Sequence, residues 1–200
     1  MFLTIHRLGK VGAANRAFIM FQSGQDIVLL HAQPEDRRKI YLWLCGWSDR
    51  EVYKELPNLE EMMDEDDYFY DGSSPGKGMY FIIRADQEEV GCISYTCFHL
   101  KSGVAEFDIW LNDESVCGKG YGYQAIMLLL DHVRNVLKIH TVLIRPYRKN
   151  HRAIHVYKKC GFVPMLLPIS AYMKEEFLEI YGAGDCGVED TENLIRTLSD

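Results

Sequence analysis

The chain has 200 residues, of which 48% are hydrophobic, and its formal net charge is −7 at pH 7. This length and composition can bury a substantial core, so we expect one domain with short appendages. The negative charge argues against non-specific binding to nucleic acid, which needs clustered lysine and arginine side chains. It favours a cationic substrate or partner instead.

The cysteine and histidine residues form no recognisable framework. Six cysteines are scattered without a CxxC pair, and no basic-then-apolar segment opens the chain, so we expect a cytoplasmic protein. The seven histidines are also dispersed, and their spacing predicts no metal site. No apolar run approaches the roughly twenty residues of a membrane span, so we expect no membrane partner.

The regular pattern begins after an N-terminal stretch, residues 1–25. This stretch could be an added strand, an arm or a contact between two copies in a homodimer. Residues 27–31 are typical of a short strand, and Pro34 marks the start of a helix. A strongly acidic stretch, residues 60–67, is either solvated surface or the wall of a cleft that receives cations.

Three β-rich runs predict an antiparallel meander. Residues 79–84 and 89–98 form a hairpin, and a turn leads to a third strand over residues 104–111. Period-two alternation places the side chains of this third strand on two faces: Ala105, Phe107, Ile109 and Leu111 on one, and Glu106, Asp108 and Trp110 on the other. We expect Glu106 to be exposed to solvent, whereas Asp108 lies closer to the following loop and favours a functional role.

A glycine-rich loop joins the third strand to a helix predicted over residues 120–137. Gly118, Gly120 and Gly122 stand at every second position, where the absence of Cβ atoms permits positive φ angles and close approach of an anion. The helix N-terminus that follows favours bound phosphate. Because the spacing matches neither a P-loop nor a dinucleotide fingerprint, the loop indicates another phosphate carrier, or only a connecting turn.

The remaining elements alternate between strands and helices. Residues 139–147 predict a strand, and residues 151–159 predict a helix with Asn150 as its N-cap and Gly161 as its C-terminal stop. Residues 162–167 follow as a closing strand.

The segment beyond Pro168 predicts one more helix, over residues 171–181. The final residues could form another short helix. We therefore divide the chain into an N-terminal extension, 1–25, a domain over 26–167, and a C-terminal helix and tail, 168–200.

Two motifs carry a resemblance to a known family. The first is the loop Cys117-Gly118-Lys119-Gly120-Tyr121-Gly122, and the second is Asn150-His151-Arg152-Ala153-Ile154-His155-Val156-Tyr157-Lys158-Lys159-Cys160-Gly161-Phe162. With the order of the predicted elements, they are similar to the GNAT superfamily of acetyl-CoA-dependent N-acetyltransferases. The resemblance implies an α+β fold, with a central, mostly antiparallel mixed sheet of about six to seven strands flanked by about four helices.

The resemblance also implies a binding site for acetyl-CoA as the co-substrate. Backbone groups at Trp110 and Leu111 would pair with its pantetheine arm, the loop residues 117–122 would hold its pyrophosphate, and Asn150 would contact it near the thiol. Cys117 stands where the family usually has Gln or Arg. This difference either weakens the cofactor site or places a reactive thiol at a helix N-terminus.

The chemistry of amine acetylation needs a proton acceptor. An amine with a pKa near 10 is mostly protonated at neutral pH and must lose a proton before it attacks a carbonyl. Asp108 is the expected base, with Glu106 as the alternative. The resemblance implies that Tyr157 faces the thioester sulfur and protonates the departing thiolate.

The expected acceptor is a small cationic amine. Residues 107–111 and 145–147 resemble the aminoglycoside 6′-N-acetyltransferases, which confer antibiotic resistance, and the net charge of −7 suits a polycation. An alternative within enzymes is a protein N-terminal acetyltransferase of the ribosomal-protein type. A further alternative is a non-catalytic acetyl-CoA-binding protein, which Cys117 favours, whereas Asp108, Asn150 and Tyr157 argue against it.

Overall fold

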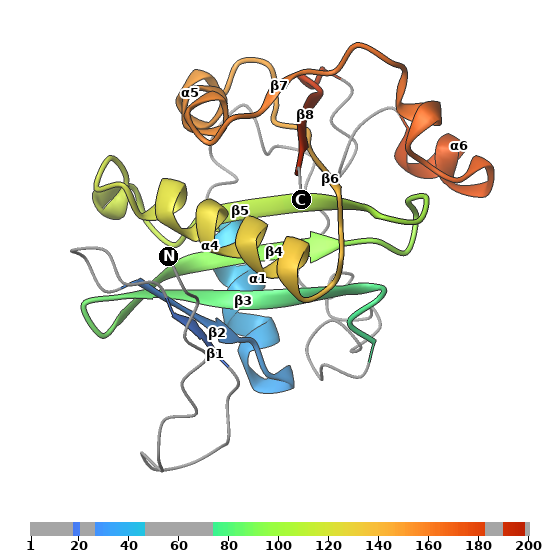
Figure 1. Ribbon diagram of the computed structural model, residues 1–200. Coiled ribbons are helices and arrows are strands. Elements are labelled where there is room, and N and C mark those ends of the chain that lie inside the picture. The colour runs from blue at the N-terminus through green and yellow to red at the C-terminus, as the bar shows by residue number, and fades with distance from the viewer. Residues whose placement is uncertain (1–17, 21–26, 47–73, 183–189, 199–200) are drawn as a thin grey trace.

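A computed structural model describes residues 18–20, 27–46, 74–182 and 190–198 of the chain. The acidic stretch at residues 60–67 lies outside these ranges. The described strands form a single mixed sheet of eight strands in the order β1-β2-β3-β4-β5-β6-β8-β7, and helices cover both of its faces (Figure 1). The predicted α+β architecture is therefore confirmed.

The first five strands form the antiparallel part of the sheet, and the last three of them are the predicted meander. Their bounds are β1, Phe18–Met20; β2, Ile27–His31; β3, Gly78–Ala85; β4, Glu88–Thr96; and β5, Val104–Leu111. Each pairs antiparallel with the next. The hairpin between β3 and β4 turns at Asp86 and Gln87, whose φ angles of 49° and 71° are typical of a tight two-residue turn. Part of the N-terminal stretch thus serves as an added strand, one of the three roles we considered.

The second half of the sheet differs from the prediction. β6, Thr141–Ile144, pairs parallel with β5, and β7 is only two residues long, Val163–Pro164, rather than a strand over 162–167. The last described residues form a strand, β8, Leu194–Thr197, and not a helix. β8 lies between β6 and β7 and pairs antiparallel with both. Open edges of the neighbouring strands decide its conformation, and local sequence does not reveal them.

Two groups of helices cover opposite faces of the sheet. Figure 1 shows α4, Tyr121–Asn135, crossing in front of the sheet, whereas α1, Arg37–Cys45, lies behind it. α5, His151–Lys159, joins the core of the α4 face through Ala153, Val156 and Tyr157. A 3-10 turn, Pro34–Asp36, leads into α1, as Pro34 predicted.

The prediction of a helix over residues 171–181 is largely wrong. This segment contains the 3-10 turns Ile169–Ala171 and Glu175–Phe177 and a four-residue helix, α6, Leu178–Tyr181. Its backbone instead pairs with the loop between β4 and β5, because the Lys101 N–H donates to the Tyr172 carbonyl (2.8 Å) and the Lys174 N–H to the His99 carbonyl (3.1 Å). These tertiary bonds replace those of a continuous helix.

Three apolar clusters hold these layers together. The largest lies between the sheet and helices α4 and α5, a second lies under α1, and a third lies under residues 165–181. α1 and residues 165–181 therefore cover the same face of the sheet, and that face carries Glu106, Asp108 and Trp110.

Glu106 is buried, contrary to the expectation that it is exposed: only 3% of its surface is accessible. Nε and Nη2 of Arg145 donate to its two carboxylate oxygens, and Nε2 of His99 lies 2.9 Å from Oε2. Nη1 of Arg145 also donates to the Tyr181 carbonyl at 2.7 Å. The prediction failed because the covering segment, residues 165–181, and the partners of Glu106 all lie far from it in the sequence.

This buried ion pair stands where β5 and β6 separate. The parallel register of the two strands covers three residue pairs and ends at Glu106 and Leu143. Arg145 follows directly after the end of β6, so its contact with Glu106 continues the connection between the strands one step beyond their last backbone pair. The position of the two strands after they separate therefore depends on a side-chain contact.

The partners of Glu106 also set its charge state. Burial acts to raise its pKa, but the hydrogen bond with His99 and the charge and hydrogen bonds of Arg145 outweigh burial and lower the pKa below its ordinary value. A carboxyl group whose pKa is lower in the folded state stabilises the fold above its ordinary pKa, and this stabilisation is lost as the pH falls through the folded pKa.

We predict that Glu106→Gln lowers the free energy of unfolding by about 3–5 kcal/mol at neutral pH, because it leaves the Arg145 charge buried without its partner. Glutamine does not titrate, so the difference between wild type and variant should shrink as the pH falls below the ordinary glutamate pKa of 4.5. Urea unfolding at a series of pH values measures both effects. The control is Glu88→Gln, an exposed carboxylate in the same sheet. Equal stabilities of the two variants would contradict the prediction.

Candidate active site

The candidate site is built on the second half of β5. After Glu106 the strand continues to Leu111, beyond its pairing with β6. The predicted alternation is confirmed: Ile109 and Leu111 pack against the core under α4, whereas Trp110 packs against the cluster under α1. β4 remains paired on the other edge throughout, with Ser94 opposite Asp108 and Cys92 opposite Trp110.

Asp108 lies between two covered parts of its face. On one side, the indole N–H of Trp110 donates to the Ile40 carbonyl of α1 (3.3 Å) and the Trp110 ring meets Tyr80 edge-on at 6.1 Å. On the other side, Glu106 is buried, and its partner Arg145 donates to the Tyr181 carbonyl of α6. Asp108 itself is half-buried. Asp108 is thus partly exposed at a position between two covered residues of the same face.

The glycine loop has the backbone geometry that its sequence predicts. Gly118 and Gly120 have φ angles of 77° and 87°, and α4 begins directly after them at Tyr121. A Cβ atom on Gly118 would meet nothing within 4 Å, so the loop is open on that side. Gly122 lies inside the first turn of α4. The loop and the free amides of this turn form an exposed, anion-accepting helix N-terminus.

The other loop residues differ in what they present to a ligand. Lys119 is exposed, whereas the Tyr121 side chain is buried in the core and only its backbone is available at the loop. Cys117 is half-buried; its N–H donates to the Glu114 carbonyl at 3.0 Å, and its Sγ lies 3.7 Å from the Asp113 carbonyl oxygen. The thiol of Cys117 therefore packs against the short 3-10 turn Glu114–Val116 that precedes it.

Gly91 is a site residue that sequence reasoning missed. It pairs with Leu111 across β4 and β5, and a Cβ atom there would lie 2.8 Å from the Leu111 Cα and would also overlap the Trp110 carbonyl oxygen. Next to it, the Asn112 side chain donates to the Glu89 carbonyl at 2.6 Å. The end of β5 is thus held at a separation from β4 that no other residue than glycine permits.

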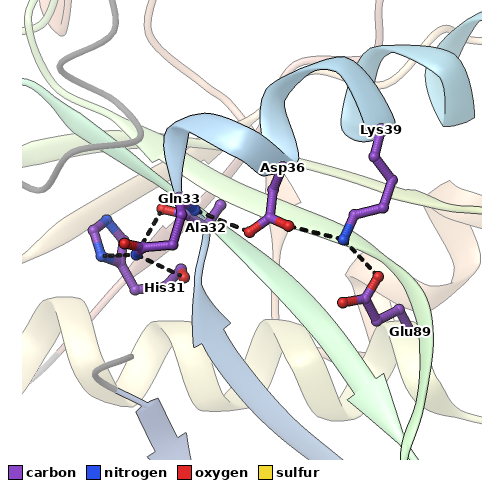
Figure 2. Close-up of polar contacts among 6 residues, drawn as sticks. All are labelled: His31, Ala32, Gln33, Asp36, Lys39 and Glu89. Carbon is purple, nitrogen blue, oxygen red and sulfur yellow. Dashed lines mark hydrogen bonds and ion pairs between the residues drawn. The ribbon is translucent and has the colours of Figure 1, made fainter. Parts of the chain in front are cut away.

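A polar network fastens α1 beside this end of β5. Figure 2 shows that the Gln33 N–H donates to Asp36 Oδ2 (3.0 Å), and that Lys39 Nζ bridges Asp36 Oδ1 (2.8 Å) and Glu89 Oε2 (2.6 Å). Burial acts to lower the pKa of Lys39, but its bonds to Asp36 and Glu89 outweigh burial and raise it. Lys39 is therefore a cation that joins the start of α1 to Glu89 on β4, and Glu89 lies two residues before Gly91.

α5 places the second motif on the other side of β5. Asn150 is the predicted N-cap, since its side-chain oxygen accepts from the Ala153 N–H at 3.2 Å. At the other end of α5, the Arg196 side chain of β8 donates to the Cys160 carbonyl. Tyr157 is 7% exposed and belongs to the same cluster as Ile109. Asp108 and Tyr157 therefore lie on opposite faces of β5.

Two negative observations apply to the part of the chain that the structure describes. Within it, no group of three or more His, Cys, Asp or Glu side chains gathers as metal ligands would. In the same ranges, no helix is long and apolar enough to cross a membrane.

Comparison with known proteins identifies related sequences. The model of the acetyltransferase (GNAT) domain family matches residues 26–163. A spermidine N(1)-acetyltransferase of Vibrio cholerae is 24% identical over 152 residues, which cover 76% of this chain and 79% of that protein. The enzyme of the same description from Escherichia coli K12 is 25% identical over 138 residues, which cover 69% of this chain and 68% of that protein.

Solved structures share the fold at lower sequence identity. The aminoglycoside acetyltransferase AAC(6′)-Ib in complex with coenzyme A is 18% identical, has a TM-score of 0.60, and is aligned over 86% of this chain and 94% of its own. The ribosomal L7/L12 α-N-protein acetyltransferase RimL is 17% identical and has a TM-score of 0.66. The alignment covers 95% of this chain and 100% of that chain. Because the family model covers more than half of the chain, the chain belongs to the GNAT acetyltransferase family and is an N-acetyltransferase.

Proposed function

We propose that this N-acetyltransferase transfers the acetyl group of acetyl-CoA to a primary amine of a small polycation, either a polyamine such as spermidine or an aminoglycoside. The observation that carries the proposal is the half-buried Asp108 on β5, which leads into the open glycine loop at the start of α4. In this proposal Asp108 is the proton acceptor, and the helix N-terminus after it binds the anionic part of the co-substrate.

The residues of the loop and of β5 fit acetyl-CoA as the co-substrate. Positive φ angles and open space at Gly118, together with the free amides before and within the first turn of α4, suit a pyrophosphate. The exposed Lys119 adds a positive charge there. Backbone groups of Trp110 and Leu111, which Gly91 holds in place, would bind the pantetheine arm. Asn150 would contact it near the thiol, with Cys117 packed at the entrance of the loop.

Proton transfer is assigned to groups on the two faces of β5. Acetyl-CoA supplies a thioester carbonyl that an amine can attack. Asp108 takes a proton from the ammonium group, directly or through water, and the neutral amine then attacks the carbonyl carbon; a backbone N–H in residues 109–111 stabilises the negative charge that develops on oxygen. Tyr157 gives a proton to the sulfur as the C–S bond breaks, and the extra proton that the nitrogen carries after attack passes to solvent, which leaves the amide and the free thiol. Glu106, the alternative base, is disfavoured because Arg145 and His99 engage its carboxylate.

The proposal for the acceptor rests on charge and on the relatives. The net charge of −7 attracts a polycation over a distance. The curated relatives described above are spermidine N(1)-acetyltransferases, whereas the aminoglycoside enzyme is similar in fold. The similarity in fold to RimL keeps acetylation of a protein N-terminus as a second candidate.

An acceptor screen tests the proposed function. We expect release of CoA thiol in the presence of acetyl-CoA and spermidine, spermine or kanamycin, with kcat/KM at least about tenfold above that for N-terminal peptides, and falling as salt is added. Turnover only with peptides would favour the ribosomal-protein type. Acetyl-CoA binding measured by calorimetry, without turnover of any amine, would identify a non-catalytic binding protein.

We predict that Asp108→Asn lowers kcat by about a hundredfold or more, because an amide cannot accept the proton of the ammonium group. The affinity for acetyl-CoA, measured by calorimetry, should remain unchanged. Asp86→Asn in the exposed β3–β4 turn is the matched control and should retain full activity. Near-normal turnover of the Asp108 variant would remove this residue from the mechanism.

Replacement of Tyr157 by phenylalanine tests the acid. We predict that Tyr157→Phe lowers kcat by about a hundredfold at unchanged acetyl-CoA affinity, because the thiolate then leaves without a proton donor. Tyr95→Phe removes a hydroxyl from the same core, where it donates to the Pro75 carbonyl (2.9 Å), and serves as the control for stability. A large loss of acetyl-CoA affinity would instead assign Tyr157 to cofactor packing.

A further inference from the structure

Ser94 is a buried polar side chain that neither the fold nor the proposed mechanism explains. It stands in the middle of β4, between Ile93 and Tyr95, and only 1% of its surface is accessible. Its hydroxyl has no hydrogen-bond partner among the described residues. A buried hydroxyl without a partner costs stability, on the order of 1–3 kcal/mol, so its presence in a core strand calls for an explanation.

The register of the sheet places Ser94 beside Asp108. The two residues are directly opposite each other in the antiparallel pair of β4 and β5. Side chains at such positions share one face of the sheet, with Cβ atoms about 4.5–5.5 Å apart. Both side chains are short, so a hydroxyl and a carboxylate end at similar depth above the sheet. Cβ atoms at this separation allow the two groups to reach hydrogen-bonding range when the side chains adopt suitable χ1 rotamers.

The other neighbours of Ser94 are poorer partners. Tyr80 lies opposite Ser94 on β3, but its hydroxyl is at the far end of a ring that packs against Trp110. Along β4, the next residues on the same face are Cys92, which is buried against apolar side chains, and Thr96, which lies opposite Glu106. Asp108 is therefore the nearest group on this face that accepts a strong, charge-assisted hydrogen bond.

We propose that Ser94 is a positioning residue for Asp108: its hydroxyl donates to the Asp108 carboxylate, directly or through one water molecule, and orients it toward the acceptor amine. The proposal rests on the proposed role of Asp108 as the base. A donor that stabilises the ionised carboxylate lowers its pKa, so Ser94 also keeps Asp108 ionised at lower pH.

Other charged or titratable groups face this carboxylate and must be held constant in the test. Cys92 on β4, Tyr80 on β3 and Glu106 on β5 share its face of the sheet, and Asp36, in the 3-10 turn before α1, and Lys39, on α1, act together with Asp108 on the charge of Cys92. None of them is changed by substitution of Ser94, so a change in the titration of Asp108 reports on the lost hydroxyl.

The direct test is the carboxyl titration of Asp108 followed by carbon-13 NMR in protein labelled at aspartate, with the Asp108 signal assigned from Asp108→Asn. We expect Ser94→Ala to raise the pKa of Asp108 by about half a pH unit to one pH unit, because the carboxylate loses a donor. Ser94→Thr, which keeps the hydroxyl, should restore the wild-type value. An unchanged Asp108 titration in Ser94→Ala would overturn the proposal, whichever amine the enzyme accepts.

Kinetics and stability separate positioning from packing. With spermidine as acceptor, or kanamycin if the screen selects it, Ser94→Ala should lower kcat about tenfold and shift the acidic limb of kcat/KM to higher pH. Its stability should change little, because the loss of the proposed bond to Asp108 is offset by the lower cost of burying a methyl group in place of a hydroxyl. Thr96→Val, which removes a hydroxyl two residues along the same face, is the control. Wild-type kcat and pH profile in Ser94→Ala would contradict the proposal.

A double-mutant cycle distinguishes failure of this inference from failure of the proposed function. If Ser94 acts through Asp108, Ser94→Ala should have no further effect on kcat in the Asp108→Asn background. An Asp108→Asn variant with full activity would refute the proposed base. An Asp108→Asn variant with low activity, combined with a Ser94→Ala effect that adds to it independently, would refute only the role assigned to Ser94.

Discussion

The buried contact between Glu106 and Arg145 is the constraint on which the candidate site depends. β5 and β6 pair over three residues and then separate, and this contact lies at the point of separation. Such an ion pair is costly to desolvate and is stable here because His99 and the Tyr181 carbonyl satisfy the remaining hydrogen-bonding groups. The same set of bonds therefore fixes two strands, the loop before β5 and the segment that ends in α6.

The site lies between β5, α1 and β4, and a different contact holds each of these elements in place. The indole of Trp110 attaches β5 to α1, and Lys39 attaches α1 to β4. Gly91 permits the close approach of β4 to the end of β5. Asp108 is the half-buried group between these contacts and the buried Glu106. In the proposed mechanism, a flexible acceptor meets a carboxylate whose surroundings are already ordered, which reduces the entropy lost on reaching the reactive geometry.

Local patterns in the sequence predicted most of the elements but not their partners. The alternation along β5, the positive φ angles of the glycine loop and the N-cap at Asn150 depend on neighbouring residues, and all three were predicted correctly. The burial of Glu106 and the strand β8 depend on contacts with residues far along the chain. The sequence instead predicted an exposed Glu106 and a short helix in the final residues, and both predictions were wrong. Ser94 could have been noticed as the one polar residue in the run Gly91 to Tyr95, but only the register with β5 gives it a meaning.

The place of β8 in the sheet has a consequence for the order of folding. β8 is the last described strand in the chain, yet it lies between β6 and β7, and its Arg196 closes the end of α5. The contact that closes the end of the helix carrying Tyr157 therefore forms only after the chain has been synthesised to β8. Contacts of such long sequence separation slow folding, so the half of the molecule that contains α5 should become ordered later than the antiparallel meander of β3 to β5, whose strands pair with their neighbours in the sequence.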